Sequence, residues 1–187
     1  RLALDTRFPE EETLRLTVHA ARPARLAVRV RLPYWTAGAQ AQLNGKPLAA
    51  SGAASGYLAV ERTWRDGDTL NVRLPMRLHT APMPDDSSIQ AVMYGPLVLA
   101  ARLGTQGLTP ENLRAPPTRP RKVPEYTTEP IPVAPLVLRS GGDPQSWLAP
   151  VPGRSLEFRT RGQQDDLTFV PLNRVFDERY AVYFQVK

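Results

Sequence analysis

Apolar and polar side chains alternate along several stretches of this chain, and this alternation constrains the fold more than any other feature. Residues 13–20 place leucine, valine or alanine at every second position, and residues 24–32 repeat the pattern with mostly arginine between the apolar positions. A period of two puts one face of an extended segment in a core and the other in water. The pattern therefore predicts antiparallel β-sheet with one solvated face.

Turn residues separate these stretches at short intervals. Asn44-Gly45 is typical of a two-residue hairpin turn, and Asp66-Gly67 predicts a second turn. With further apolar strands expected at 56–62, 69–74, 89–94 and 97–101, the first hundred residues hold roughly eight short strands. This density predicts an all-β fold, an antiparallel β-sandwich or jelly roll.

The composition divides the chain into three predicted parts. Residues 1–103 form the β-sandwich domain, and residues 104–135 form a Pro-rich connector, since seven prolines fall between 116 and 135. Residues 136–187 form a smaller β segment with four predicted strands and a short helix begun by Asp143-Pro144. About fifty residues bury little core alone, so this segment is expected to dock on the sandwich or on parts of a longer chain.

Composition also excludes several kinds of site. The chain has no cysteine and two histidines, His19 and His79, so neither a metal site nor a cofactor is expected. The net charge is +6, but the arginines are interleaved with acids along the chain, which does not favour nucleic-acid binding. No apolar run reaches the length of about 18 residues that spans a bilayer, so no membrane segment is expected. The chain begins at Arg1, which suggests a piece of a longer polypeptide and leaves its localisation unknown.

No familiar catalytic pattern occurs, and no catalytic residue is expected. Paired carboxylates can cleave a glycosidic bond, and adjacent acids occur at 85–86, 165–166 and 177–178. Neighbouring side chains on an extended segment point apart. These acids are therefore interpreted as loop residues.

The three tryptophans are the candidate contacts for a sugar. Trp35 follows a predicted strand, Trp64 precedes the Asp66-Gly67 turn, and Trp147 lies in the predicted short helix. An exposed indole ring can stack on a sugar, whereas a buried one closes the end of a core. Core packing is favoured for Trp35 and Trp64, and the choice stays open for Trp147.

Several short motifs occur in order along the chain, at Asp5–Pro9, Arg31–Trp35, Leu43–Lys46, Gly56–Leu58, Arg62–Trp64, Gly67-Asp68, Leu74–Met76, Tyr94–Val98 and Arg179–Phe184. Together they resemble the region downstream of the catalytic barrel in glycoside hydrolase family 127, the β-L-arabinofuranosidase-like proteins. The resemblance covers residues 1–103 well and 136–187 moderately. It implies a parent with an (α/α)6 barrel that carries a zinc-bound cysteine nucleophile and a glutamate, followed by β-sandwich domains. Nothing here matches those catalytic positions.

Three hypotheses for function follow. The first is a non-catalytic accessory region that supports the missing barrel, with Pro82–Ser88 as a loop that could reach the substrate cleft. The second is a carbohydrate-binding module that exposes Trp35, Trp64 or Trp147. The third is an interaction module that uses the arginines of residues 25–31 for an acidic partner. The first is favoured.

Overall fold

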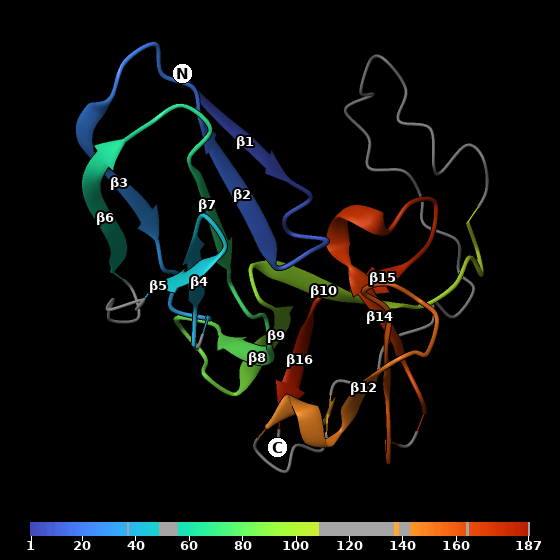
Figure 1. The fold of residues 1–187 in the computed structure, drawn as a ribbon. Helices are drawn as coiled ribbons and strands as arrows, with labels where there is room; N and C mark the ends of the chain where they lie inside the picture. Colours follow the sequence, from blue (N-terminus) through green and yellow to red (C-terminus); the bar gives the residue numbers. More distant parts are fainter. Residues whose placement is uncertain (37, 49–55, 109–136, 139–142, 164, 187) are drawn as a thin grey trace, which may run out of the picture. The chain divides into compact units, whose positions relative to one another are not determined.

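The chain forms two compact units in a computed structural model that describes residues 1–36, 38–48, 56–108, 137–138, 143–163 and 165–186. The N-terminal unit comprises residues 1–78 together with 94–96, and the C-terminal unit comprises 79–93 together with 97–187. Figure 1 labels their strands.

The N-terminal unit consists of a five-stranded antiparallel sheet and a two-stranded antiparallel ribbon. The sheet has the order β1 (Leu2–Thr6), β2 (Thr13–Val18), β7 (Thr69–Arg73), β4 (Gln40–Leu43) and β5 (Lys46–Leu48). The ribbon pairs β3 (Ala24–Arg31) with β6 (Tyr57–Trp64). Strand β1 lies at one edge of the sheet and β5 at the other.

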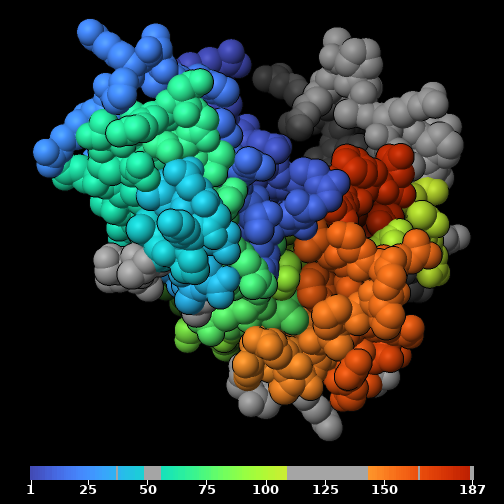
Figure 2. All heavy atoms as spheres, viewed as in Figure 1, coloured from blue at the N-terminus to red at the C-terminus, as the bar shows by residue number. Residues whose placement is uncertain are grey.

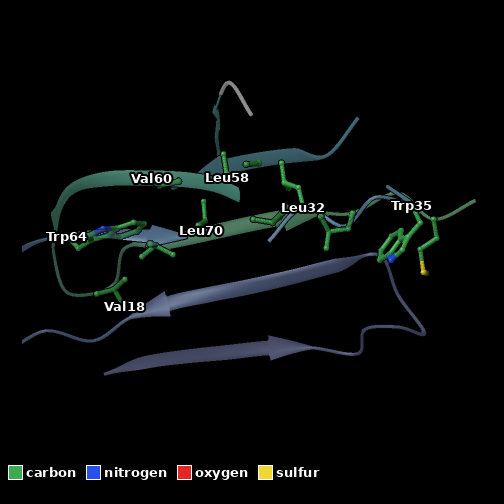
Figure 3. Close-up of a cluster of buried hydrophobic side chains, with 12 residues drawn as sticks. Val18, Leu32, Trp35, Leu58, Val60, Trp64 and Leu70 are labelled. Carbon is green, nitrogen blue, oxygen red and sulfur yellow. The ribbon is translucent and has the colours of Figure 1, made fainter. Parts of the chain in front are cut away.

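The predicted alternation places one face of each sheet in a shared core. Leu16 of β2 lies opposite Leu70 of β7, so their side chains emerge on the same face, and Leu70 is fully buried. Val60 comes from the ribbon into the same apolar cluster. The labelled core side chains in Figure 3 lie between the layers, with Trp64 at one end and Trp35 at the other.

Two turns of this unit are joined by side-chain hydrogen bonds. Asn44 begins the β4–β5 turn with a φ of 50°, and Gly45 follows at 77°, as the Asn-Gly pair predicts. The Asn44 Nδ2 group donates to Asp68 at 2.8 Å, and its Oδ1 accepts from the Thr69 backbone N–H at 2.8 Å. Asp68 also accepts from the Arg65 backbone N–H at 2.8 Å. Asp68 therefore connects the β6–β7 turn to the hairpin.

The C-terminal unit is built on a nine-stranded sheet. Its path is β11 (Val137–Leu138), β16 (Tyr183–Val186), β9 (Ile89–Tyr94), β10 (Leu97–Arg102), β14 (Thr168–Pro171), β13 (Phe158–Thr160) and β12 (Leu148–Pro150), while β15 (Tyr180–Ala181) pairs with β10 and β8 (Leu78–Pro82) with β9. Two 3-10 helices, η1 (Pro144–Ser146) and η2 (Leu172–Arg174), complete the described elements. Phe169 and Phe184 pack in its core with ring centroids 5.3 Å apart.

The predicted fold class is confirmed. The described residues form antiparallel sheets in a sandwich-like arrangement, with β11 and β16 as a parallel pair. The short helix after Asp143 is present, and the Asp143 carboxylate caps it by accepting from the Gln145 backbone N–H. Strands β1, β8 and β12 were not predicted.

The units divide the chain differently from the predicted boundary at residue 103. Strands β9 and β10, expected in the first domain of 1–103, hydrogen-bond to β16 and β14. Strand pairing, which is non-local, therefore places them with the segment of 136–187. The predicted connector of 104–135 lies mostly outside the described residues.

Candidate functional site

An apolar groove opens on the N-terminal unit beside the end of β3. Its volume is about 430 Å³. The residues that line it are Leu4, Thr6, Phe8, Leu14, Val30, Arg31, Pro33, Tyr34, Trp35, Leu74 and Pro96. Most of these side chains are aliphatic or aromatic, so the groove suits an apolar partner.

Edge strand β1 explains why the groove is uncovered. Leu4 lies opposite Leu16, and Leu2 lies opposite Val18, so both β1 leucines emerge on the core face of the sheet. Leu4 is nevertheless 62% exposed and Leu2 51%, whereas Val18 is only 4% exposed. The β1 leucines thus extend beyond the part of the sheet that the core covers.

Two stacked aromatic rings close one end of the groove. The rings of Phe8 and Trp35 are 6.1 Å apart with an interplanar angle of 15°. Trp35 itself is buried at 6% exposure, while Tyr34 beside it is 62% exposed. Buried rings and strands thus hold the groove walls in place, and Leu4 and Tyr34 present its apolar surface to solvent.

A polar depression of about 580 Å³ lies on the outer face of the same sheet. It is lined by Asp5, Thr6, Arg7, Glu11, Thr13, Leu14, Arg15, Gln40, Gln42, Asn71, Val72 and Arg73. Gln40 and Gln42 come from the β4–β5 hairpin, which Figure 2 shows in cyan on the visible face.

The three sequence-predicted tryptophans do not gather into one site. Trp64 is fully buried, and its Nε1 donates to the Leu26 carbonyl at 3.1 Å while the Arg62 guanidinium lies 5.5 Å from its ring centroid. Trp147 belongs to the C-terminal unit and is 4% exposed, and its Nε1 has no hydrogen-bond partner among the residues that the structure describes. Because Trp35 is also buried, none of the three offers an open ring face, which argues against a sugar platform built from them.

Two of the acidic pairs hold structural ion pairs. The Glu178 carboxylate accepts two hydrogen bonds from the Arg102 Nε, at 2.8 and 3.0 Å. Asp166 lies 3.7 Å from Arg159. Arginines thus engage one acid in each of these pairs, in keeping with the interpretation as loop acids.

The third acidic pair lies in the predicted Pro82–Ser88 loop. Asp86 Oδ1 accepts from the Ser88 backbone N–H at 2.9 Å and from the Ser88 hydroxyl at 2.7 Å. These hydrogen bonds lower the pKa of the Asp86 carboxyl. Asp86 therefore organises the connection between β8 and β9, which is a local role.

The arginine face of β3 and the histidines complete the predicted candidates. Arg25, Arg29 and Arg31 are exposed, and Arg25 pairs with Glu61 at 3.2 Å. His19 is exposed, with its Nδ1 3.9 Å from Asp66. Within the described residues no group of three or more His, Asp or Glu side chains could hold a metal ion. No described helix is long and apolar enough to cross a membrane.

The sequence reasoning missed the two surfaces with the most organised geometry. The polar depression depends on which residues face each other across four strands, and alternation within one strand does not reveal its neighbours. The groove depends on β1, whose leucines at positions 2 and 4 were the only local signal.

Two protein-family models match the chain. The middle domain of GH127 β-L-arabinofuranosidases matches residues 1–76, and a domain of unknown function matches residues 79–186. Residues 1–76 thus carry the GH127 middle domain, and residues 79–186, more than half of the chain, belong to the family of that domain of unknown function. The predicted resemblance is thereby confirmed, and the part matched at residues 1–76 is the middle domain of such proteins.

Solved structures share the fold of this GH127 region. A GH127 β-L-arabinofuranosidase from Geobacillus stearothermophilus T6 is 20% identical over the whole chain, with a TM-score of 0.62. A structure described as a glycoside hydrolase is 15% identical over 99% of the chain with a TM-score of 0.62, and another GH127 β-arabinofuranosidase is 15% identical over the whole chain with a TM-score of 0.59. No curated protein matches the chain.

The GH127 region spans about a third of the proteins whose structures it matches. It covers 32%, 30% and 31% of the three chains. The region thus resembles a non-catalytic domain of larger glycoside hydrolases.

Proposed function

We propose that this chain is a non-catalytic accessory region of a larger glycoside hydrolase, and that it packs against the part of the longer chain that carries out the reaction. The observation that carries the proposal is the apolar groove beside β1. Leucines on the core face of a sheet are normally covered by other side chains, so exposed leucines there mark an interaction site. The matched structures, about three times as long as this chain, support a partner within the same polypeptide.

Burial of the groove contributes a useful amount of free energy. Covering a fully exposed leucine stabilises a protein by roughly 1.5–3 kcal/mol. Leu4 and Leu2 still expose 62% and 51% of their surface, so covering both would contribute about 2–3 kcal/mol. The surrounding aromatic and proline side chains add to this.

Hydrolysis of a glycoside is assigned to the absent part, an (α/α)6 barrel by the family resemblance. One acid of each adjacent pair is engaged in an ion pair or a turn, and no carboxylate is among the described residues that line the groove. Pro82–Ser88 stays a proposed contact to the substrate cleft. Carbohydrate binding through the three tryptophans is not proposed, because their rings are buried.

A pair of variants in two contexts tests the packing. Leu4→Asp is made in this chain and in the longer protein. The control is Leu26→Asp in both, since Leu26 of β3 is also exposed but does not line the groove. Thermal unfolding is measured for both, and glycosidase activity for the longer protein. Leu4→Asp should lower the unfolding temperature more in the longer protein than in this chain, since a carboxylate would be enclosed at the interface. Leu26→Asp should act equally in both.

Equal effects of Leu4→Asp in the two contexts would refute the packing role. Glycoside hydrolysis by the isolated chain would refute the non-catalytic assignment. The two outcomes are independent, because the first concerns an interface and the second a reaction.

A further inference from the structure

Four polar side chains form one row across the outer face of the five-stranded sheet. Asp5 of β1 lies opposite Arg15 of β2, Arg15 lies opposite Asn71 of β7, and Asn71 lies opposite Gln42 of β4. Directly opposed residues in antiparallel strands share a face. The row crosses three strand spacings of about 4.8 Å each, so it is roughly 14 Å long.

A second polar row lies beside the first. Thr13 faces Arg73, and Arg73 faces Gln40, each two residues from its neighbour in the first row. Two residues along a strand span about 6.7 Å. The rows and the β1–β2 connection, which contributes Arg7 and Glu11, enclose the depression of about 580 Å³.

The first row is free of internal side-chain partners. In the part of the chain that the structure describes, the side chains of Asp5, Arg15, Asn71 and Gln42 form no hydrogen bond or ion pair. By contrast, Arg73 in the second row is held by Glu12, with its Nε 2.9 Å from Oε2. The row therefore presents donors and acceptors that are available to a ligand.

The charges around the depression balance. Three arginines (Arg7, Arg15 and Arg73) and two acids (Asp5 and Glu11) line it, and a third acid, Glu12, lies against Arg73 outside the lining. Arg7 pairs with Glu11, and Arg73 pairs with Glu12. A phosphate or another polyanion gains little from a neutral surface, so the charge pattern favours an uncharged ligand.

The chemistry of the row fits hydroxyl groups. Asn71, Gln42 and Gln40 each offer both a donor and an acceptor, and a hydroxyl group is also both. The apolar lining residues, Leu14 and Val72, belong to the core face of their strands. A protein partner needs an apolar centre to its interface, and this face offers none.

We propose that the outer face of the sheet β1-β2-β7-β4 binds an uncharged carbohydrate chain of about two or three sugar units through hydrogen bonds. A sugar unit repeats at roughly the spacing of neighbouring strands, about 5 Å, so each unit meets the side chains of one or two strands. This site does not include the buried tryptophans, and of the groove's lining it shares only Thr6 and Leu14. It does not depend on the packing role proposed above.

Titration of the 187-residue chain with uncharged oligosaccharides tests the proposal. The probes are arabinofuranosyl, xylo- and cello-oligosaccharides at up to millimolar concentration, with heparin as a polyanion, and the readout is backbone amide chemical-shift change. At least one uncharged oligosaccharide should shift amides of β2, β7 and β4 together. Asn71→Ala and Gln42→Ala should each weaken binding about five- to tenfold, whereas Thr63→Ala, on the outer face of β6, should leave it unchanged.

Three results would overturn the proposal: no shifts with any oligosaccharide, shifts that cluster away from this face, or tighter binding of heparin than of every uncharged probe. An equal loss with Thr63→Ala would also refute it. Circular dichroism of each variant shows that the fold is intact. Gln42→Ala, at an exposed position, keeps the test decisive if Asn71→Ala alters the sheet.

Discussion

The carboxylate of Asp68 offers the sharpest test of how the N-terminal unit holds together. Asp68 is 8% exposed and accepts two hydrogen bonds of 2.8 Å, from the Arg65 backbone N–H and the Asn44 amide. A hydrogen bond to a charged group contributes about 1.5–3 kcal/mol. Asp68→Ala is therefore expected to lower the free energy of unfolding by about 3–5 kcal/mol, a large part of the roughly 5–15 kcal/mol that a typical domain has.

Asp68→Asn separates charge from shape. Its amide oxygen still accepts from Arg65, but its NH₂ group meets the Asn44 NH₂ group, donor against donor. Asn44 cannot rotate its amide without losing the 2.8 Å bond from the Thr69 backbone N–H. The expected loss is about 2 kcal/mol. Glu61→Gln is the control, because the Glu61–Arg25 pair is exposed and contributes less than about 1 kcal/mol.

The effect has a defined pH dependence. Hydrogen bonds from the Arg65 backbone and from Asn44 lower the pKa of Asp68 below its ordinary value of 3.8. A lowered pKa stabilises the folded chain above that ordinary value, and the contribution is lost as the pH falls through the folded-state pKa. The difference between wild type and Asp68→Asn should be full at pH 7 and shrink from about pH 5 downward.

Urea unfolding at pH 7 and at several lower pH values measures these differences, with the slope of each transition as a check on the unfolded state. Equal stability of wild type and Asp68→Asn at pH 7 would refute the hydrogen-bond argument. A gap that stays constant down to pH 3 would refute the assignment to a carboxylate.

Three further substitutions test the core of the same unit. Gly95→Ala places a Cβ 2.6 Å from the Met76 Cγ at a φ of +54°, so it should lower the free energy of unfolding by about 2–3 kcal/mol. Met76→Ala should cost less in the Gly95→Ala variant than in the wild type when urea midpoints are compared. Additive losses would contradict the contact. Trp64→Ala should cost about 3–5 kcal/mol by the same assay because the ring is fully buried; an unchanged midpoint would show that Trp64 is not a core residue.

Local patterns predicted the strands well because alternation is a property of each segment alone. The stretches predicted at 13–20 and 24–32 form β2 (Thr13–Val18) and β3 (Ala24–Arg31), and Asn44-Gly45 makes the predicted turn. The helix cap at Asp143 was also readable, since it needs only three neighbouring residues.

Non-local pairing could not be predicted in the same way. The sequence of β9 and β10 contains no sign that they pair with β16 and β14, where Ala91 lies opposite Tyr183 and Ala100 opposite Val170. The short β1 and β8 gain their regular structure from neighbouring strands, since their own apolar pattern is brief. The sequence alone could not decide whether a tryptophan packs in the core or contacts a ligand, because indole chemistry serves both, and the choice depends on burial in the folded chain.

The two proposed surfaces arise from opposite faces of one edge strand, and this makes them separable. Leu4 and Asp5 are adjacent in β1, but Leu4 emerges on the core face with Leu16 and Asp5 on the outer face with Arg15. A change at one position thus alters the groove and leaves the polar row chemically intact. If Leu4→Asp weakened oligosaccharide binding as much as Asp5→Ala did, both effects would trace to loss of β1 from the sheet rather than to either surface. If Leu4→Asp weakened only the packing and Asp5→Ala weakened only oligosaccharide binding, β1 must have stayed paired in both variants. That result would assign each face of β1 its own partner.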